Sequence, residues 1–138
     1  MTHQTGLLDT SAVLRLWELA ATDLPDSAVI SAITLAELSV GPLVATDPQE
    51  QAARLAQIQQ VEAAYGEPLA FDTAAARAFA QVAADIRSAG QKTKARAFDA
   101  LIAATAKASG LPLYTFNPRD FAAVTGIEVV PLPPKADD

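Results

Sequence analysis

Three acidic residues occupy positions where an acid is unusual, inside or directly after apolar segments. Asp9 ends the apolar run at residues 6–8, whereas Glu37 and Asp99 lie in stretches rich in Ala, Leu and Ile with helical spacing. A carboxylate in apolar surroundings is costly unless it is neutralised, hydrogen-bonded or bound to a cation. Three such acids, spread over one chain, therefore predict a shared cation and metal-dependent chemistry.

Two of these acids also fit an ordinary structural role. Asp9 precedes a helix predicted to begin at Ser11 and can serve as its N-cap. Thr34 and Glu37 have the spacing of a capping box, in which the Glu side chain reaches back to the backbone of the Thr. Each residue therefore fits both interpretations when it is considered alone.

Asp99 is harder to explain as a structural acid. Arg96 is its only charged neighbour at helical spacing, so the structural interpretation is a single ion pair between these two residues. Asp120 follows Asn117 and Pro118 in a segment where an acid often begins a turn or a short helix. If all four acids reach the same edge of the fold, a shared metal site explains them better than four separate structural roles.

The available donors point to a hard metal ion. Clustered carboxylates raise one another's pKa unless a cation compensates their charge. The chain has no cysteine, and its one histidine, His3, lies close to the N-terminus. Oxygen ligands alone favour Mg²⁺, with Mn²⁺ as a substitute, over zinc.

Length and composition predict one folded domain over residues 1–138. The chain is 51% hydrophobic, which excludes a disordered protein. No signal peptide and no membrane-length apolar run is evident, so a cytoplasmic protein is expected. The net charge is −6, yet four of the ten basic residues fall between positions 87 and 96. This basic stretch is either a solvated helix end or a phosphate-binding surface; it contains Arg87, Lys92, Lys94 and Arg96.

Strand-like and helical segments alternate along the chain. Strands are predicted at residues 6–8, 28–33, 69–71, 113–116 and 127–130, and helices at 11–21, 35–44, 48–65, 73–88 and 95–109. This order predicts an α/β fold with a mostly parallel sheet covered on both faces. Ligands of such sheets bind beyond the carboxyl ends of the strands, where the acids are expected to converge. The tail from about residue 131 is expected to fray.

Four sequence blocks, in order from residue 7 to about 130, resemble PIN-domain proteins, in particular the VapC-type toxins of bacterial toxin–antitoxin pairs. The blocks are Leu7-Leu8-Asp9-Thr10-Ser11, Ile33-Thr34-x-x-Glu37-Leu38-x-x-Gly41, Phe98-Asp99-Ala100-Leu101-Ile102-Ala103-Ala104-Thr105-Ala106 and Thr115-x-Asn117-x-x-Asp120-Phe121.

The resemblance implies a three-layer αβα PIN-like fold and a Mg²⁺-dependent endoribonuclease that cuts structured RNA, such as a tRNA or rRNA loop. It places the first three catalytic acids on Asp9, Glu37 and Asp99, and the fourth position on Asn117 or Asp120. It also implies a homodimer and a cognate VapB-like antitoxin. Phe116 stands where the family often has Arg.

The remaining polar residues of these segments are candidates for RNA contacts. Thr10 and Ser11 are expected to orient the scissile phosphate at a helix N-terminus. Lys92, Lys94 and Arg96 are expected to hold flanking phosphates. Apolar faces of the first two helices, including Trp17, are expected to hold the dimer and the antitoxin. The alternative function is a partner-binding module of the same fold with weak or no nuclease activity.

Overall fold

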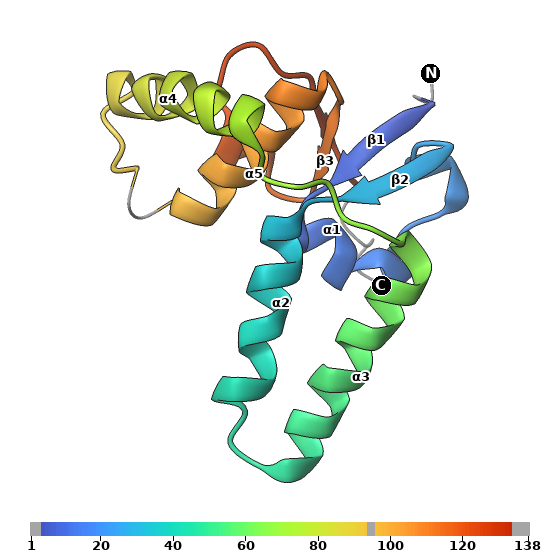
Figure 1. Ribbon diagram of the computed structural model, residues 1–138. Coiled ribbons are helices and arrows are strands. Elements are labelled where there is room, and N and C mark those ends of the chain that lie inside the picture. Colours follow the sequence, from blue (N-terminus) through green and yellow to red (C-terminus); the bar gives the residue numbers. More distant parts are fainter. Residues whose placement is uncertain (1–3, 94–95, 134–138) are drawn as a thin grey trace.

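The computed structural model describes residues 4–93 and 96–133, and its centre is a four-stranded sheet in which every pair of neighbours is parallel. The strands follow the spatial order β2-β1-β3-β4 (Figure 1). Their bounds are β1 Thr5–Leu8, β2 Ser27–Ile30, β3 Leu113–Thr115 and β4 Val129–Pro131. The predicted parallel α/β architecture is confirmed.

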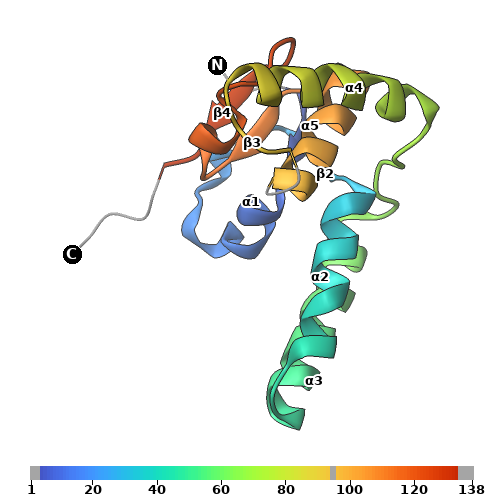
Figure 2. The same cartoon turned by 90° about the vertical axis from the view of Figure 1, so that its left-hand side faces the viewer.

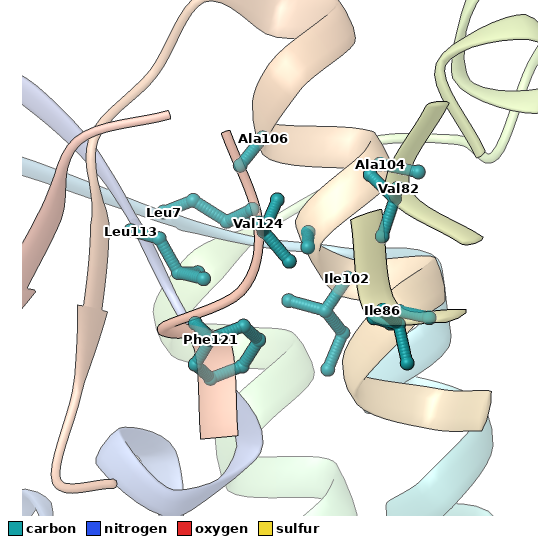
Figure 3. Close-up of a cluster of buried hydrophobic side chains, with 11 residues drawn as sticks. Leu7, Val82, Ile86, Ile102, Ala104, Ala106, Leu113, Phe121 and Val124 are labelled. Carbon is teal, nitrogen blue, oxygen red and sulfur yellow. The ribbon is translucent and has the colours of Figure 1, made fainter. Parts of the chain in front are cut away.

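Two hydrophobic clusters lie on the two faces of the sheet, because successive strand residues point to opposite faces. Leu7 and Leu113 join the cluster formed with α4 (Thr73–Ser88) and α5 (Ala97–Ser109), shown in Figure 3. The next residues along these strands, Leu8 and Tyr114, join a cluster that includes side chains of α1 (Thr10–Leu14), α2 (Ala32–Val44) and α3 (Pro48–Tyr65). The result is the predicted three-layer arrangement.

The helices α2 and α3 form a hairpin that projects away from the sheet in both views (Figures 1 and 2). Arg54 of α3 fastens it, donating from Nη1 to the carbonyl oxygen of Gly41 at 2.7 Å and pairing with Glu50. A Cβ at Gly41 would lie 3.2 Å from Cδ of Arg54, so the absence of a side chain there lets the two helices approach. The hairpin extends α2, which carries Glu37, beyond the body of the domain.

Local capping signals set the ends of three helices as predicted. Asp47 caps α3 and is followed by Pro48, and the side chain of Asp72 accepts a hydrogen bond from the backbone of α4. Gly110 ends α5 in the left-handed conformation, with φ of 66°. A non-glycine residue is strained in that region, which explains why glycine ends the helix.

The helix predicted at residues 11–21 is shorter and broken. Helix α1 ends at Leu14, and two 3₁₀ helices follow, Leu16–Glu18 and Ala21–Asp23. Leu16 and Leu19 pack beside the second hydrophobic cluster. Tertiary contacts of this kind override a local helical pattern.

Three other predicted boundaries also differ. The apolar run at residues 69–71 forms no strand; Leu69 makes a single bridge to Ser31 at the end of β2. Strand β2 ends at Ile30 and α2 begins at Ala32. The helix therefore begins three residues before its predicted start at residue 35. Leu132, expected in a frayed tail, is buried and donates its backbone N–H to the carbonyl oxygen of Thr115.

In the described part of the chain, no helix is long and apolar enough to cross a bilayer.

Candidate functional site

The site lies at the carboxyl ends of β1 and β3, the two central strands. From β1 the chain continues to β2 on one side, whereas from β3 it continues to β4 on the other. Such a switch of direction leaves a crevice at the strand ends, the usual ligand position in open α/β sheets. Asp9 follows β1, and its backbone N–H donates to Tyr114 of β3 at 3.1 Å. The topology therefore brings residues about a hundred positions apart to one edge.

Asp9 is only 3% exposed, and one of its carboxylate oxygens accepts two hydrogen bonds. Its Oδ1 accepts from the backbone N–H of Ala12 at 2.9 Å and from Oγ of Ser11 at 2.7 Å. Burial raises the pKa of Asp9, and hydrogen bonds from Thr115, Ser11 and Ala12 oppose that rise. The N-cap interpretation of Asp9 is therefore confirmed, and its ligand role stays a prediction that its position at the strand ends favours.

Glu37 is half-buried and is oriented by a chain of hydroxyl groups. Thr10 donates from Oγ1 to Oε1 of Glu37 at 2.6 Å, and Oγ1 of Thr34 lies 3.1 Å from Oγ1 of Thr10. Thr10 has one hydroxyl proton and gives it to the carboxylate, so Thr34 must be the donor to Thr10. Burial raises the pKa of Glu37, the bond from Thr10 lowers it, and the charge of Asp9 raises it.

The predicted capping box between Thr34 and Glu37 is therefore wrong. Ser31 is the N-cap of α2, and its Oγ accepts from the backbone N–H of Thr34 at 3.1 Å. Glu37 lies more than one turn inside the helix and turns toward Thr10 instead. With the capping role removed, the site role becomes the better explanation of this acid.

Asp99 lies in the first turn of α5 and feels every other acid of the group. The pKa of Asp99 is raised to about 6: burial is the main cause, the negative charges of Asp120, Asp9 and Glu37 contribute, and Arg96 opposes the rise. Like charges shift a pKa only when they are close or poorly screened. The structure therefore gathers these carboxylates, which we call the acid cluster: Asp9, Glu37, Asp99 and Asp120.

The ion pair expected between Arg96 and Asp99 is replaced by a longer-range one. Arg96 donates from Nη1 to Oδ1 of Asp120 at 2.8 Å, across 24 positions of sequence. Asp120 belongs to the 3₁₀ helix Pro118–Phe121, and Asn117 precedes it as an exposed N-cap residue whose side chain makes no capping bond. Of the two residues proposed for the fourth position, Asp120 is the one whose charge contributes to the raised pKa of Asp99.

The hydroxyl groups of Thr10 and Ser11 orient the acids, so the predicted contact with a phosphate stays a prediction for their backbone N–H groups. Their hydroxyl protons are already donated to Glu37 and Asp9. The buried hydroxyl of Thr115 has a similar role, because it accepts from the backbone of Asn117 at 2.9 Å and bonds to Asp9. Thr115 belongs to the fourth sequence block, but its contact with Asp9 was not predicted, since a threonine inside a strand usually needs no functional explanation.

One of the three predicted basic residues lies at the site. Arg96 reaches the acid cluster, Lys92 is exposed, and Lys94 lies outside the described residues. Two arginines that the sequence did not single out also lie nearby. Arg54 lines a cavity of about 270 Å³ together with Thr10 and Glu37; Arg15 stacks on the ring of Phe116.

The acid cluster suits a hard cation by its chemistry. All its donors are carboxylate oxygens, and their mutual repulsion is the electrostatic condition that a cation relieves. Within residues 4–93 and 96–133, however, no three acids are arranged so that they could hold one ion together. Mg²⁺ usually keeps several waters and binds through one or two carboxylates. A ligand set of that size, with the remaining acids acting through water, fits this arrangement.

We expect Thr10→Val to lower RNA cleavage by about 10- to 100-fold, the range seen when a partner that orients a metal ligand is lost. The variant removes the hydroxyl that fixes Glu37 while keeping the β-branched shape. Thr10→Ser, which keeps the donor, is the matched control and should retain most activity. Equal rates for the two variants, measured on the same labelled RNA, would exclude an orienting role for this hydroxyl.

Comparisons with known proteins agree with this architecture. The PIN domain family model matches residues 7–127. The chain is 34% identical over 134 residues to Ribonuclease VapC5 of Mycobacterium tuberculosis, covering 95% of this chain and 96% of that protein. It is 36% identical over 103 residues to Ribonuclease VapC4 of the same species, covering 75% of each.

Solved structures give the same result. The VapBC-5 toxin–antitoxin structure from Mycobacterium tuberculosis has a TM-score of 0.77 at 33% identity, covering 94% of this chain and 99% of that one. DNA-bound VapBC from Salmonella typhimurium has a TM-score of 0.70 at 27% identity, covering 94% and 97%. The chain therefore belongs to the PIN-domain family, among the proteins related to the VapC ribonucleases.

Proposed function

We propose that this protein is the toxin of a type II toxin–antitoxin system, a metal-dependent endoribonuclease that cuts structured RNA such as a tRNA or rRNA loop. The acid cluster is the observation that carries the proposal: burial raises the pKa of Asp99 to about 6, and the negative charges of Asp120, Asp9 and Glu37 contribute to that rise. The relatives named ribonucleases support the same activity. A target in translation implies that the protein acts in the cytoplasm.

Asp9, Asp99 and Glu37 would hold Mg²⁺, or Mn²⁺ in its place, directly or through water. A bound divalent ion supplies charge neutralisation at the phosphate and lowers the pKa of a bound water. The chain's own contribution is orientation. Ser11 and Thr115 fix Asp9, Thr10 fixes Glu37, and Arg96 holds Asp120 at the edge of the cluster.

Cleavage of a tRNA mixture tests the activity directly. We expect defined fragments with Mg²⁺ or Mn²⁺ and intact RNA in EDTA, with activity restored when the cation is added back. A Glu37→Gln protein purified in the same way controls for contaminating nuclease. Fragments that persist in EDTA would contradict metal dependence; intact RNA with every cation would favour the alternative, a partner-binding module without nuclease activity.

We also propose that an antitoxin covers an apolar groove beside the site and that two copies of the chain form a dimer. A cavity of about 440 Å³ lies between the first helical segment and α3, lined by Leu14, Leu16, Trp17, Val61 and Tyr65 among others. Trp17 is 71% exposed. An amphipathic segment of a partner fits such a groove. The VapBC-5 structure from Mycobacterium tuberculosis belongs to a family of toxin–antitoxin systems.

Antitoxin binding is expected to weaken as Mg²⁺ rises, if the partner places a basic side chain on the acid cluster. The cation and the basic side chain would then compete for the same carboxylates, and linkage makes that competition reciprocal. Calorimetry at constant ionic strength, with the product of a neighbouring small gene as partner, measures the effect. Affinity that changes neither with Mg²⁺ nor with Asp99→Asn would show that the partner blocks the groove without touching the acids.

A further inference from the structure

Arg15 forms a rigid planar group beside the site. Its guanidinium carbon lies 3.9 Å from the centroid of the Phe116 ring. Its edge is held by Glu18, through Nε to Oε2 at 2.7 Å and Nη2 to Oε1 at 2.9 Å. The Glu18 side chain is 7% exposed, whereas the Arg15 side chain remains 40% exposed. The guanidinium is therefore fixed in orientation while it stays accessible to a ligand.

Hydrogen bonds connect this group to the acid cluster. The backbone N–H of Phe116 donates to Oγ of Ser11 at 3.2 Å, and Ser11 donates to Asp9 at 2.7 Å. Arg15 itself is the C-cap of α1 and donates its backbone N–H to the carbonyl of Ser11. The stack of Arg15 on Phe116 is thus connected, through the backbone of Phe116, to the hydroxyl of Ser11 that orients Asp9.

We propose that Arg15, supported by Phe116, is a stacking platform for one RNA base next to the cleaved bond, an inference that rests on the proposed function. Splayed bases of single-stranded RNA stack on aromatic rings and on guanidinium planes. Phe116 covers one face of the guanidinium and packs beside the second hydrophobic cluster. The exposed part of Arg15 is then the surface that a base reaches.

Charge favours stacking over a phosphate contact at this position. Glu18 offsets the charge of Arg15 and occupies its Nε and Nη2 donors, so the side-on bidentate contact with a phosphate is already taken. Stacking uses the plane of the guanidinium, so the pair with Glu18 leaves it possible. Arg15 would therefore select for an unpaired base at the site and contribute little to the salt dependence of binding.

Binding of a short fluorescent single-stranded RNA and of the same strand with one abasic nucleotide tests the proposal. All proteins carry Asp99→Asn so that the RNA stays intact. We expect Arg15→Ala and Arg15→Lys each to weaken binding by about tenfold, the scale of one stacked base. The stacked position is found by moving the abasic nucleotide along the strand. At that position the abasic nucleotide should weaken binding to the protein with Arg15 by a similar factor. It should not weaken binding to the Arg15→Ala protein any further. Arg77→Ala, an exposed arginine on α4, is the control.

Several results would overturn the proposal. Full binding by Arg15→Ala excludes the contact, while RNA cleavage by the chain with Arg15 and Asp99 intact leaves the proposed function standing. Full binding by Arg15→Lys, with a salt slope reduced by about 0.7 in Arg15→Ala, identifies a phosphate contact instead. An abasic penalty that persists in Arg15→Ala shows that Arg15 only supports the local fold. If neither the protein nor its variants bind RNA, and none is cleaved, the proposed function fails as well.

Discussion

Asp99→Asn is expected to reduce RNA cleavage by about 10³-fold or more, the scale of losses when a preorganised charged group is removed from an active site. The amide keeps the shape of the side chain and removes its charge and its capacity as an anionic ligand. Cleavage is measured on one RNA with matched protein preparations and saturating Mg²⁺. An Asp99→Asn protein that cleaves at the rate of the unchanged chain would contradict the proposed mechanism.

The same variant should be more stable than the unchanged chain in metal-free buffer above pH 6. The pKa of Asp99 rises from 3.8 to about 6 in the folded state, so folding favours its protonated form. Ionisation of Asp99 therefore destabilises the native state, and its effect develops as pH rises from 3.8 to about 6. The difference in unfolding free energy between variant and unchanged chain should grow across this window and vanish below it.

Urea unfolding at several pH values measures that difference. Asp26→Asn, at an exposed acid in the loop before β2, controls for the general effect of removing one negative charge. Adding Mg²⁺ should raise the midpoint of the unchanged chain and have little effect on Asp99→Asn, because a ligand stabilises only the state that binds it. A stability difference that is independent of pH would show that Asp99 is not strained by its neighbours.

Gly6→Ala is expected to destabilise the domain by about 1–3 kcal/mol, the range for overpacking a filled core. A Cβ at this position of β1 would lie 2.5 Å from Cε1 of Tyr114 and 3.0 Å from Cγ of Pro25. Tyr114 is almost fully buried, so its ring has little room to move. Urea denaturation gives the change in unfolding free energy, and the loss should also lower cleavage because β1 leads directly to Asp9.

Gly41→Ala is the matched control for this prediction. Its Cβ would meet only the side chain of Arg54, with Cδ at 3.2 Å, and that chain is flexible. We therefore expect a clearly smaller loss than for Gly6→Ala. A Tyr114→Leu substitution should recover part of the stability in the Gly6→Ala background, since contacting residues show coupling energies. Equal effects at the two glycines would contradict the steric explanation.

The sequence predicted the fold best where local chemistry determines an element. The bounds of α3 and α4 agree with the prediction, because each helix begins directly after an aspartate that caps it. The run at residues 69–71 looked like a strand but adds only one bridge to the sheet. Pro68 lacks the N–H that a longer ladder needs, and Asp72 already caps the next helix.

The sequence indicated which acids come together, but it did not indicate most of the residues that bind and orient them. The four acids lie close enough to interact electrostatically, as acids placed in or directly after apolar segments indicated. Their partners were missed, because Arg96 pairs with Asp120 across 24 positions and Thr10 bonds to Glu37 across 27. Such distances in sequence carry no periodic signal. The role of Arg15 was hidden for the same reason, since its contact with Phe116 forms only when α1 meets β3.

The sheet order β2-β1-β3-β4 has implications for how the protein is made. While the chain grows from its N-terminus, β1 and β2 are synthesised early, but β3, the neighbour that completes the centre of the sheet, comes only at residues 113–115. Asp99 and Asp120 likewise come late. Until then the growing chain holds only half of the acid cluster, so we expect it to lack the proposed nuclease activity while it is still being synthesised. A fragment that ends before residue 99 should therefore cleave no RNA.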